Sequence, residues 1–150
     1  LTGLLANDIS DLSGAGLLAL PEARLDRELL SLYDIEDAFA FFPHRVESAD
    51  IVGQVTGEAA GMTGLSEGTP VIGGFFDVVS SAMGSGVINA GEASIIAGTW
   101  SINQVFADRP VISPDVFMVT TFGRNRYVNI ESSATSAANL EWYVHRVRGG

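Results

Sequence analysis

An α/β fold is predicted by a change in sequence character part-way along the chain and by one acidic residue that ends an apolar run. Helical patterns prevail up to residue 86, and short strand-like runs prevail from residue 87 to residue 150. The apolar run 70–76 leads to Asp77, and small residues follow to Gly84. This order predicts a buried strand that delivers Asp77 to the start of a helix, where open α/β sheets bind ligands.

Composition narrows the class of protein. The 150 residues suffice for one ordinary domain with a sizeable core, and 47% apolar with 17% charged residues argues against disorder. A net charge of −10 disfavours nucleic acid and anionic membrane surfaces as partners and favours solubility. The absence of Cys excludes disulfides and thiolate metal sites, which fits a cytoplasmic protein. No apolar stretch reaches the roughly 18 residues typical of a membrane span.

The first part is predicted to alternate short strands with helices. The expected elements are a strand at 1–6, a polar turn at 8–13, an apolar run at 17–20, a helix at 22–33, a strand at 51–55, a helix at 57–63, a strand at 70–76 and a helix at 77–84. Leu25, Leu29 and Tyr33 recur at helical spacing and predict the helix at 22–33. Thr56 is expected to cap the next helix and Gly64 to close it.

The second part is predicted to be rich in strands. Apolar and β-branched runs separated by turn-forming residues predict strands at 92–97, 101–106, 117–122 and 127–131. A last helix is expected through 137–147, with Ser133 or Thr135 as its cap.

Asp77 has two interpretations that are compatible with each other. A carboxylate at the start of a helix caps the backbone N–H groups of the first turn. A carboxylate at the end of a strand also suits general-base chemistry, because it accepts the proton of an attacking hydroxyl. The upstream acids Asp8 and Asp11 are interpreted as turn formers in preference to ligands.

The pair Gly98-Thr99 lies between two apolar strands and also has two interpretations. A glycine lets a phosphate approach the backbone, and a threonine adds a hydroxyl donor. An ordinary hairpin turn accounts for the same pair. An acid and a Gly-Thr turn in this order favour phosphoryl transfer.

Several segments, taken in order, resemble a known family. Residues 6–13 resemble an A-T-D-x-S-x-A-S segment, with Asn7 in place of Thr and Leu12 in place of Ala. Further matching pieces follow at 46–48, 52–53, 63–65, 67–71, Gly73, Asp77, 91–93 and 98–99. Their order and spacing resemble the FGGY carbohydrate kinases, within the sugar kinase, heat-shock protein and actin superfamily.

The resemblance implies a ribonuclease-H-like fold that is present only in part. Residues 1–86 would be the end of the N-terminal kinase domain, and residues 87–150 the start of the C-terminal one. The catalytic cleft lies between these domains in the family. Since the family's chains are several times longer, this sequence is interpreted as a piece that has no kinase activity by itself.

The resemblance also assigns site residues. Asp77 falls on the position of the catalytic aspartate, and Gly98 with Thr99 on the pair that lines the nucleotide phosphates. Val78 occupies a substrate-side position where many relatives carry Asn or Gln, so its side chain has no amide to offer a sugar. Ser132 lies where small residues admit the nucleotide, with a helix cap as the alternative. The implied cofactors are ATP and Mg²⁺, and the metal-binding and adenine-binding residues are expected outside this sequence.

The expected function is therefore ATP-dependent phosphorylation of a sugar hydroxyl. The string Phe75–Ser80 resembles the branch that acts on L-xylulose or 3-keto-L-gulonate, so a pentulose or related keto-sugar is the expected substrate. A non-catalytic nucleotide-binding or assembly protein of the same fold is the alternative, and a homodimer is left open. A dinucleotide-binding enzyme is disfavoured because no G-x-G-x-x-G follows a strand.

Overall fold

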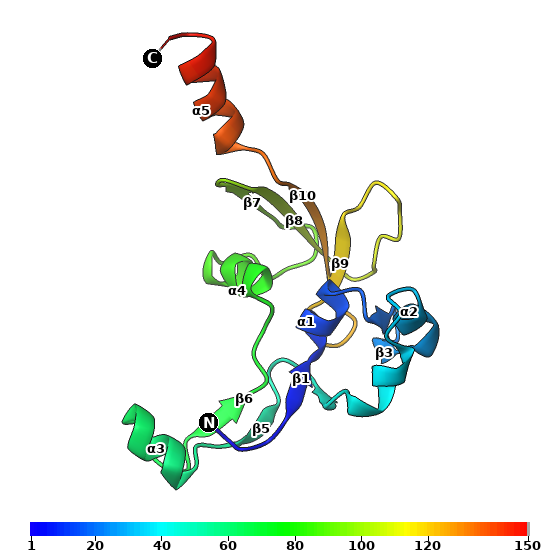
Figure 1. Ribbon diagram of the computed structural model, residues 1–150, viewed down its shortest axis with the longest axis vertical. Helices are drawn as coiled ribbons and strands as arrows, with labels where there is room; N and C mark the ends of the chain where they lie inside the picture. The colour runs from blue at the N-terminus through cyan, green and yellow to red at the C-terminus, as the bar shows by residue number, and fades with distance from the viewer. Residues whose placement is uncertain (150) are drawn as a thin grey trace.

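Residues 1–149 are described by a computed structural model, in which the chain forms two parts joined through α1 and α4 (Figure 1). The elements of the first part are β1 (Ala6–Asp8), α1 (Ile9–Gly14), β2 (Leu18–Ala19), β3 (Arg24–Leu25), α2 (Arg27–Ser31), the 3-10 helix η1 (Glu36–Phe41), β4 (His44–Val46), β5 (Ile51–Gln54), α3 (Gly57–Thr63), β6 (Pro70–Ile72) and α4 (Asp77–Gly84). The second part comprises β7 (Ala93–Ala97), β8 (Ser101–Ala107), β9 (Met118–Thr121), β10 (Tyr127–Ser133) and α5 (Ala137–Arg146).

The second part is built on an antiparallel sheet with the strand order β7-β8-β10-β9. Helix α4 covers one face of this sheet, and together they bury the main apolar core. Its buried members are Val79, Ala82, Phe106, Phe122, Val128 and Ile130. The Phe106 and Phe122 rings meet edge to face with centroids 4.9 Å apart, a favourable aromatic geometry. A helix of the first part is therefore held by the sheet of the second.

Only two-stranded sheets form among the described strands of the first part: β1 with β4 in parallel, and β2-β3 and β5-β6 as antiparallel pairs. A smaller core of Ile9, Leu12 and Leu18 lies under α1. None of the helices in the described range 1–149 is both long and apolar enough to cross a bilayer.

Local sequence signals identified several elements correctly. The helix at 57–63 is confirmed as α3: Thr56 Oγ1 accepts a hydrogen bond from the Ala59 N–H at 3.2 Å, and Gly64 closes the helix at φ +76°. The helix at 77–84 is confirmed with the same bounds as α4. The four strands expected in the second part are confirmed to within two residues at each end.

The buried strand expected at 70–76 is wrong in two respects. Strand β6 ends at Ile72, and it lies in a two-stranded antiparallel sheet where Ile72 is 48% exposed. Beyond it, the Gly73 N–H donates to the Asp50 carbonyl at 3.0 Å and the Gly74 N–H to the Ser48 carbonyl at 2.9 Å. Gly74 adopts φ +90°, which a glycine tolerates, so residues 73–76 form a loop before Asp77.

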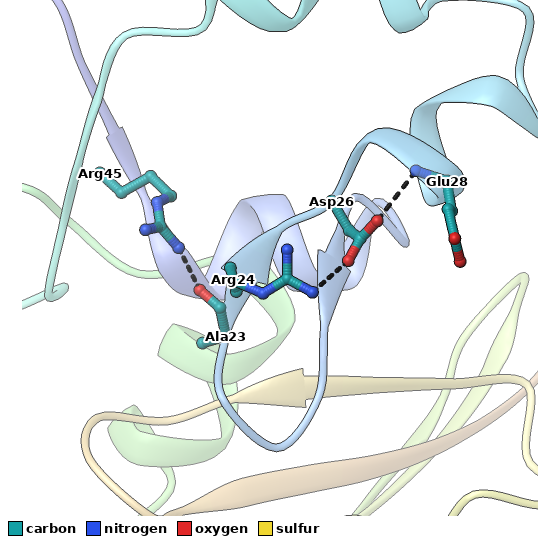
Figure 2. A network of polar contacts seen from close by, with 5 residues as sticks. All are labelled: Ala23, Arg24, Asp26, Glu28 and Arg45. Carbon is teal, nitrogen blue, oxygen red and sulfur yellow. Dashed lines mark hydrogen bonds and ion pairs between the residues drawn. The ribbon is translucent and has the colours of Figure 1, made fainter.

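The long helix expected at 22–33 is also wrong. Residues 24–25 form β3, and the helix is limited to α2 because the Asp26 side chain accepts the Glu28 N–H at 2.8 Å and caps a new start. Figure 2 shows the surrounding polar contacts: Arg24 pairs with Asp26, and the Arg45 guanidinium donates to the Ala23 carbonyl. The backbone hydrogen bond to Glu28, followed by Arg24, lowers the pKa of the Asp26 carboxyl. The strand expected at 1–6 starts only at Ala6.

Gln104 is an exception within the main core. It lies between Ile102 and Phe106 on β8, and strand alternation puts all three side chains on the face that α4 covers. Gln104 is fully buried, yet neither its Nε2 nor its Oε1 has a hydrogen-bond partner among the described residues. A buried amide without partners is unfavourable for folding.

We predict that Gln104→Met raises the free energy of unfolding of this chain by about 1–2 kcal/mol, since an unpaired buried polar group costs about 1–3 kcal/mol. Denaturant unfolding measures the change. Asn103→Met, on the exposed face of the same strand, is the matched control and should shift stability by less than about 0.5 kcal/mol. A Gln104→Met chain less stable than the original would show that the amide has a stabilising partner.

Candidate active site

The polar centre of the first part is the carboxylate of Asp8, at the end of β1. It accepts hydrogen bonds from the hydroxyls of Ser10 and Ser48 and from the Asp11 N–H at 3.0 Å. Asp8 is 9% exposed, and both serines are more deeply buried. A buried carboxylate is tolerated when donors surround it in this way. We call Asp8, Ser10, Ser48 and the Asp11 amide the Asp8 cluster.

The Asp8 cluster reaches the loop that precedes Asp77. Ser10 Oγ accepts the backbone N–H of Phe76 at 2.8 Å. The same loop lies close to the Ser48 segment, because a Cβ on Gly73 would come within 2.9 Å of Val46 Cγ2 and 3.1 Å of the Glu47 carbonyl oxygen. The residue directly before Asp77 is therefore held by a buried hydroxyl.

Asp77 occupies the first position of α4 and is exposed. Its Oδ1 accepts the Val78 N–H at 2.7 Å. The cap interpretation of Asp77 is wrong, because the N-cap residue of α4 is Phe76 and no side chain makes a capping bond there. Oδ2 has no hydrogen-bond partner among the described residues. The positive end of the helix dipole stabilises a negative charge at this position. A carboxylate with one oxygen available is suited to accept a proton.

The Gly98-Thr99 bend connects β7 to β8 and also supports α5. The Gly98 N–H donates to the Trp100 carbonyl at 3.1 Å, while the Gly98 and Thr99 carbonyls accept the N–H groups of Ala137 and Ser136 at 3.0 and 3.1 Å. The hairpin interpretation is confirmed, and the Gly98 amide is already paired. The exposed hydroxyl of Thr99 has no partner in the described part of the chain, so it is the donor that fits a phosphate.

The expected cap of α5 is wrong. Ser133 and Thr135 hydrogen-bond to each other, and the cap position is held by Ser136, whose side chain makes no capping bond. The backbone N–H groups of Ser136 and Ala137 at the start of α5 are instead bonded to the carbonyls of the bend. The bend and the start of α5 are consequently one structural unit.

Two further expected site residues lie on α4 and on the sheet face that it covers. Val78 packs against the main core. Ser132 lies within β10 opposite Ile102, so it does not cap a helix. Strand alternation puts Ser132 on the same face as Val128 and Ile130.

One hollow in the described part of the chain lies away from these groups. It measures about 610 Å³ and runs between α1 and the segment 111–119, with Leu18, Tyr33 and Phe117 among its walls. A cleft shared by Asp77 and the Gly98-Thr99 bend therefore remains a prediction.

The sequence reasoning missed the hydroxyls that connect α1 with both parts. Ser13 Oγ accepts the Thr121 N–H at 2.9 Å, and Thr120 Oγ1 donates to the Ser10 carbonyl at 2.5 Å. The signal was present in the D-x-S-x-x-S spacing of residues 8–13, which puts Ser10 and Ser13 on one short helix. The polar turn expected at 8–13 is wrong, because residues 9–14 form the helix α1, with Asp8 as its N-cap.

Comparison with known proteins identifies the family. The profile of the N-terminal domain of the FGGY family of carbohydrate kinases matches residues 1–84. The chain belongs to the FGGY family. The match covers β1 through α4, whereas the division at residues 86 and 87 and the assignment of residues 87–150 to a second domain stay predictions.

Similarity to individual FGGY proteins extends over nearly the whole chain. A probable L-xylulose kinase of Haemophilus influenzae is 33% identical over 97% of this chain and 30% of its own length. The L-xylulose/3-keto-L-gulonate kinase of Escherichia coli is 33% identical over 96% of this chain and 29% of its own. The chain thus spans about 30% of the length of the relatives that it matches.

Solved structures establish the fold. A xylulose kinase from Rhodospirillum rubrum superposes with a TM-score of 0.88 at 24% identity, over 99% of this chain and 30% of that one. The glycerol kinase of Plasmodium falciparum superposes with a TM-score of 0.80 at 18% identity, over 95% of this chain and 29% of that one. The predicted α/β, ribonuclease-H-like fold of the sugar kinase class is confirmed.

Glu92 secures the connection from α4 to β7. Its Oε2 accepts the N–H groups of Ile88 and Asn89 at 2.9 and 2.8 Å, and its Oε1 accepts Asn89 Nδ2 at 2.9 Å. The Asn89 side chain, then the two backbone N–H groups, lower the pKa of the Glu92 carboxyl below its ordinary 4.5.

A folded-state pKa below the unfolded value means that Glu92 stabilises the fold above pH 4.5 and loses this effect as pH falls through the folded pKa. We predict that the Glu92 carboxyl titrates below 4.5 by NMR. Glu92→Gln should flatten the acid side of the Tm–pH profile. Titration above that value, or an unchanged profile for Glu92→Gln, would contradict the assignment.

Proposed function

We propose that this chain is the part of an ATP-dependent sugar kinase that supplies the general base, Asp77. The observation that carries the proposal is the position of Asp77 in a chain of the FGGY family: exposed, at the first residue of α4, with Oδ2 unpaired among the described residues. An acceptor hydroxyl next to this oxygen would lose its proton to Asp77 as it attacks the terminal phosphoryl group.

The proposed substrate is a pentulose such as L-xylulose, or a related keto-sugar. Support comes from the relatives named as L-xylulose and L-xylulose/3-keto-L-gulonate kinases. Val78 is the second substrate-side position in this proposal. Because its side chain packs against the main core and has no polar atom, the hydrogen bonds to the sugar come from other groups.

In this proposal the nucleotide binds at the Gly98-Thr99 bend and at Ser132. A Cβ on Gly98 would meet only the Trp100 carbonyl oxygen, at 3.5 Å, so one side of the bend is open to an incoming group. Thr99 offers a hydroxyl donor there, and ATP supplies the phosphoryl group when bound. No cluster of acidic or histidine side chains in residues 1–149 is arranged to hold Mg²⁺, so no step is assigned to the metal.

We predict that Asp77→Asn, introduced into the complete protein that carries this sequence, lowers kcat by about 10²–10⁴-fold, because the general base is lost. Sugar-dependent ADP release measures the rate. Glu58→Gln is the matched control, since Glu58 is also an exposed acid in the first turn of a helix. Full activity of Asp77→Asn would remove Asp77 from the mechanism. Nucleotide binding without sugar-dependent ADP release by the unmodified protein would favour the non-catalytic alternative.

A separate substitution tests the proposed nucleotide binding at the Gly98-Thr99 bend. Thr99→Val should raise KM for ATP by about 10-fold, since each tenfold corresponds to the loss of about 1.4 kcal/mol, the scale of one hydrogen bond to a charged group. KM for the sugar should be unchanged. Thr69→Val, at an exposed threonine directly before β6, is the control. An unchanged KM for ATP would exclude Thr99 from phosphate binding.

A further inference from the structure

We infer that the Asp8 cluster is a positioning device for Asp77, in which Ser10 is the decisive residue. The inference rests on the proposed function of Asp77 and adds residues to which the comparisons give no role. Ser10 and Ser48 do not touch the substrate in this account. They act through the backbone that carries the general base.

The first step is the bond between Ser10 and Phe76. The Phe76 N–H lies in the N-cap residue of α4, immediately before Asp77, and it donates to Ser10 Oγ at 2.8 Å. Ser10 Oγ in turn donates to Asp8 Oδ2. Because the Ser10 proton is directed to the carboxylate, a lone pair of the same oxygen is oriented toward Phe76. The carboxylate thereby fixes the direction of the bond that holds the start of α4.

The second step is the packing around this bond. Phe76 lies against α1, since a Cβ on Gly14 would come within 3.1 Å of the Phe76 ring. Ser48 contributes twice: its hydroxyl donates to Asp8 Oδ1, and its carbonyl accepts the Gly74 N–H at 2.9 Å. The loop at residues 73–76 is thus held at both ends by one buried cluster.

The third step is the need for accurate placement. Asp77 is exposed, and among the described residues its side chain hydrogen-bonds only to the Val78 N–H of its own helix. Its location therefore depends on where α4 begins. A displacement of about 1 Å in a catalytic group costs up to about 10²-fold in rate. The buried hydroxyl of Ser10 is the group that prevents such a displacement.

The test compares two buried serines of α1 in the complete protein. Ser10→Ala removes the acceptor for Phe76, whereas Ser13→Ala removes bonds to Thr120 and Thr121 on β9. Both variants should lower Tm. Ser10→Ala should lower kcat by about 10²-fold, with KM for ATP changed less than about 2-fold, because misplaced Asp77 affects the transition state. Ser13→Ala should keep kcat within about 3-fold of the original.

Substitutions at Ser48 provide a second test if Ser10→Ala does not fold. Ser48→Ala should lower kcat by about 10-fold, and Ser48→Thr, which keeps the hydroxyl, should restore it. Amide hydrogen exchange at Phe76 should accelerate in Ser10→Ala and not in Ser13→Ala. Equal kcat losses in Ser10→Ala and Ser13→Ala, or full kcat in both Ser10→Ala and Ser48→Ala, would overturn the inference.

Asp77→Asn, measured in parallel, separates the two proposals. If it abolishes turnover while Ser10→Ala and Ser48→Ala are fully active, the positioning role fails and the general base stands. If Asp77→Asn is fully active, both fail.

Discussion

The buried carboxylate of Asp8 is the constraint on which the first part of this chain depends. It accepts hydrogen bonds from two hydroxyls and one backbone N–H. Through Ser48 it joins β1 to the segment between β4 and β5, and through Ser10 to the loop after β6. Each of these segments is short, and none forms a larger sheet in the described structure. The small apolar core at α1 does not hold these segments together alone. Hydrogen bonds to one buried carboxylate also hold them.

The second part is ordered by a different interaction. Helix α4 packs its apolar side on the four-stranded sheet, and Glu92 holds the connection between them. Helix α1 is bonded to both parts, because Ser10 holds Phe76 while Ser13 accepts from Thr121 on β9. The backbone that presents Asp77 is therefore fixed from two sides. The proposed general base is exposed, while the backbone that carries it is bonded to buried groups.

Elements with local signals were predictable from the sequence, as α3 shows with Thr56 before it and Gly64 after it. The apolar run at 70–76 was misjudged because its last residues bond to Ser48 and Asp50, which lie more than 20 positions earlier. The proposed roles of Asp77, Gly98 and Thr99 came from family resemblance. Ser10 was not identified because its partner Phe76 lies 66 positions away, and the chemistry of one hydroxyl does not reveal a distant partner.

The most direct test of the account is a crystal structure of the complete protein with a keto-sugar and a non-hydrolysable ATP analogue. The account predicts the acceptor hydroxyl about 2.6–3.2 Å from Asp77 Oδ2, with the terminal phosphate on the far side of that hydroxyl and Ser10 still bonded to the Phe76 N–H. A sugar bound away from Asp77, or an Asp77 carboxylate turned to solvent while both ligands are in place, would contradict it.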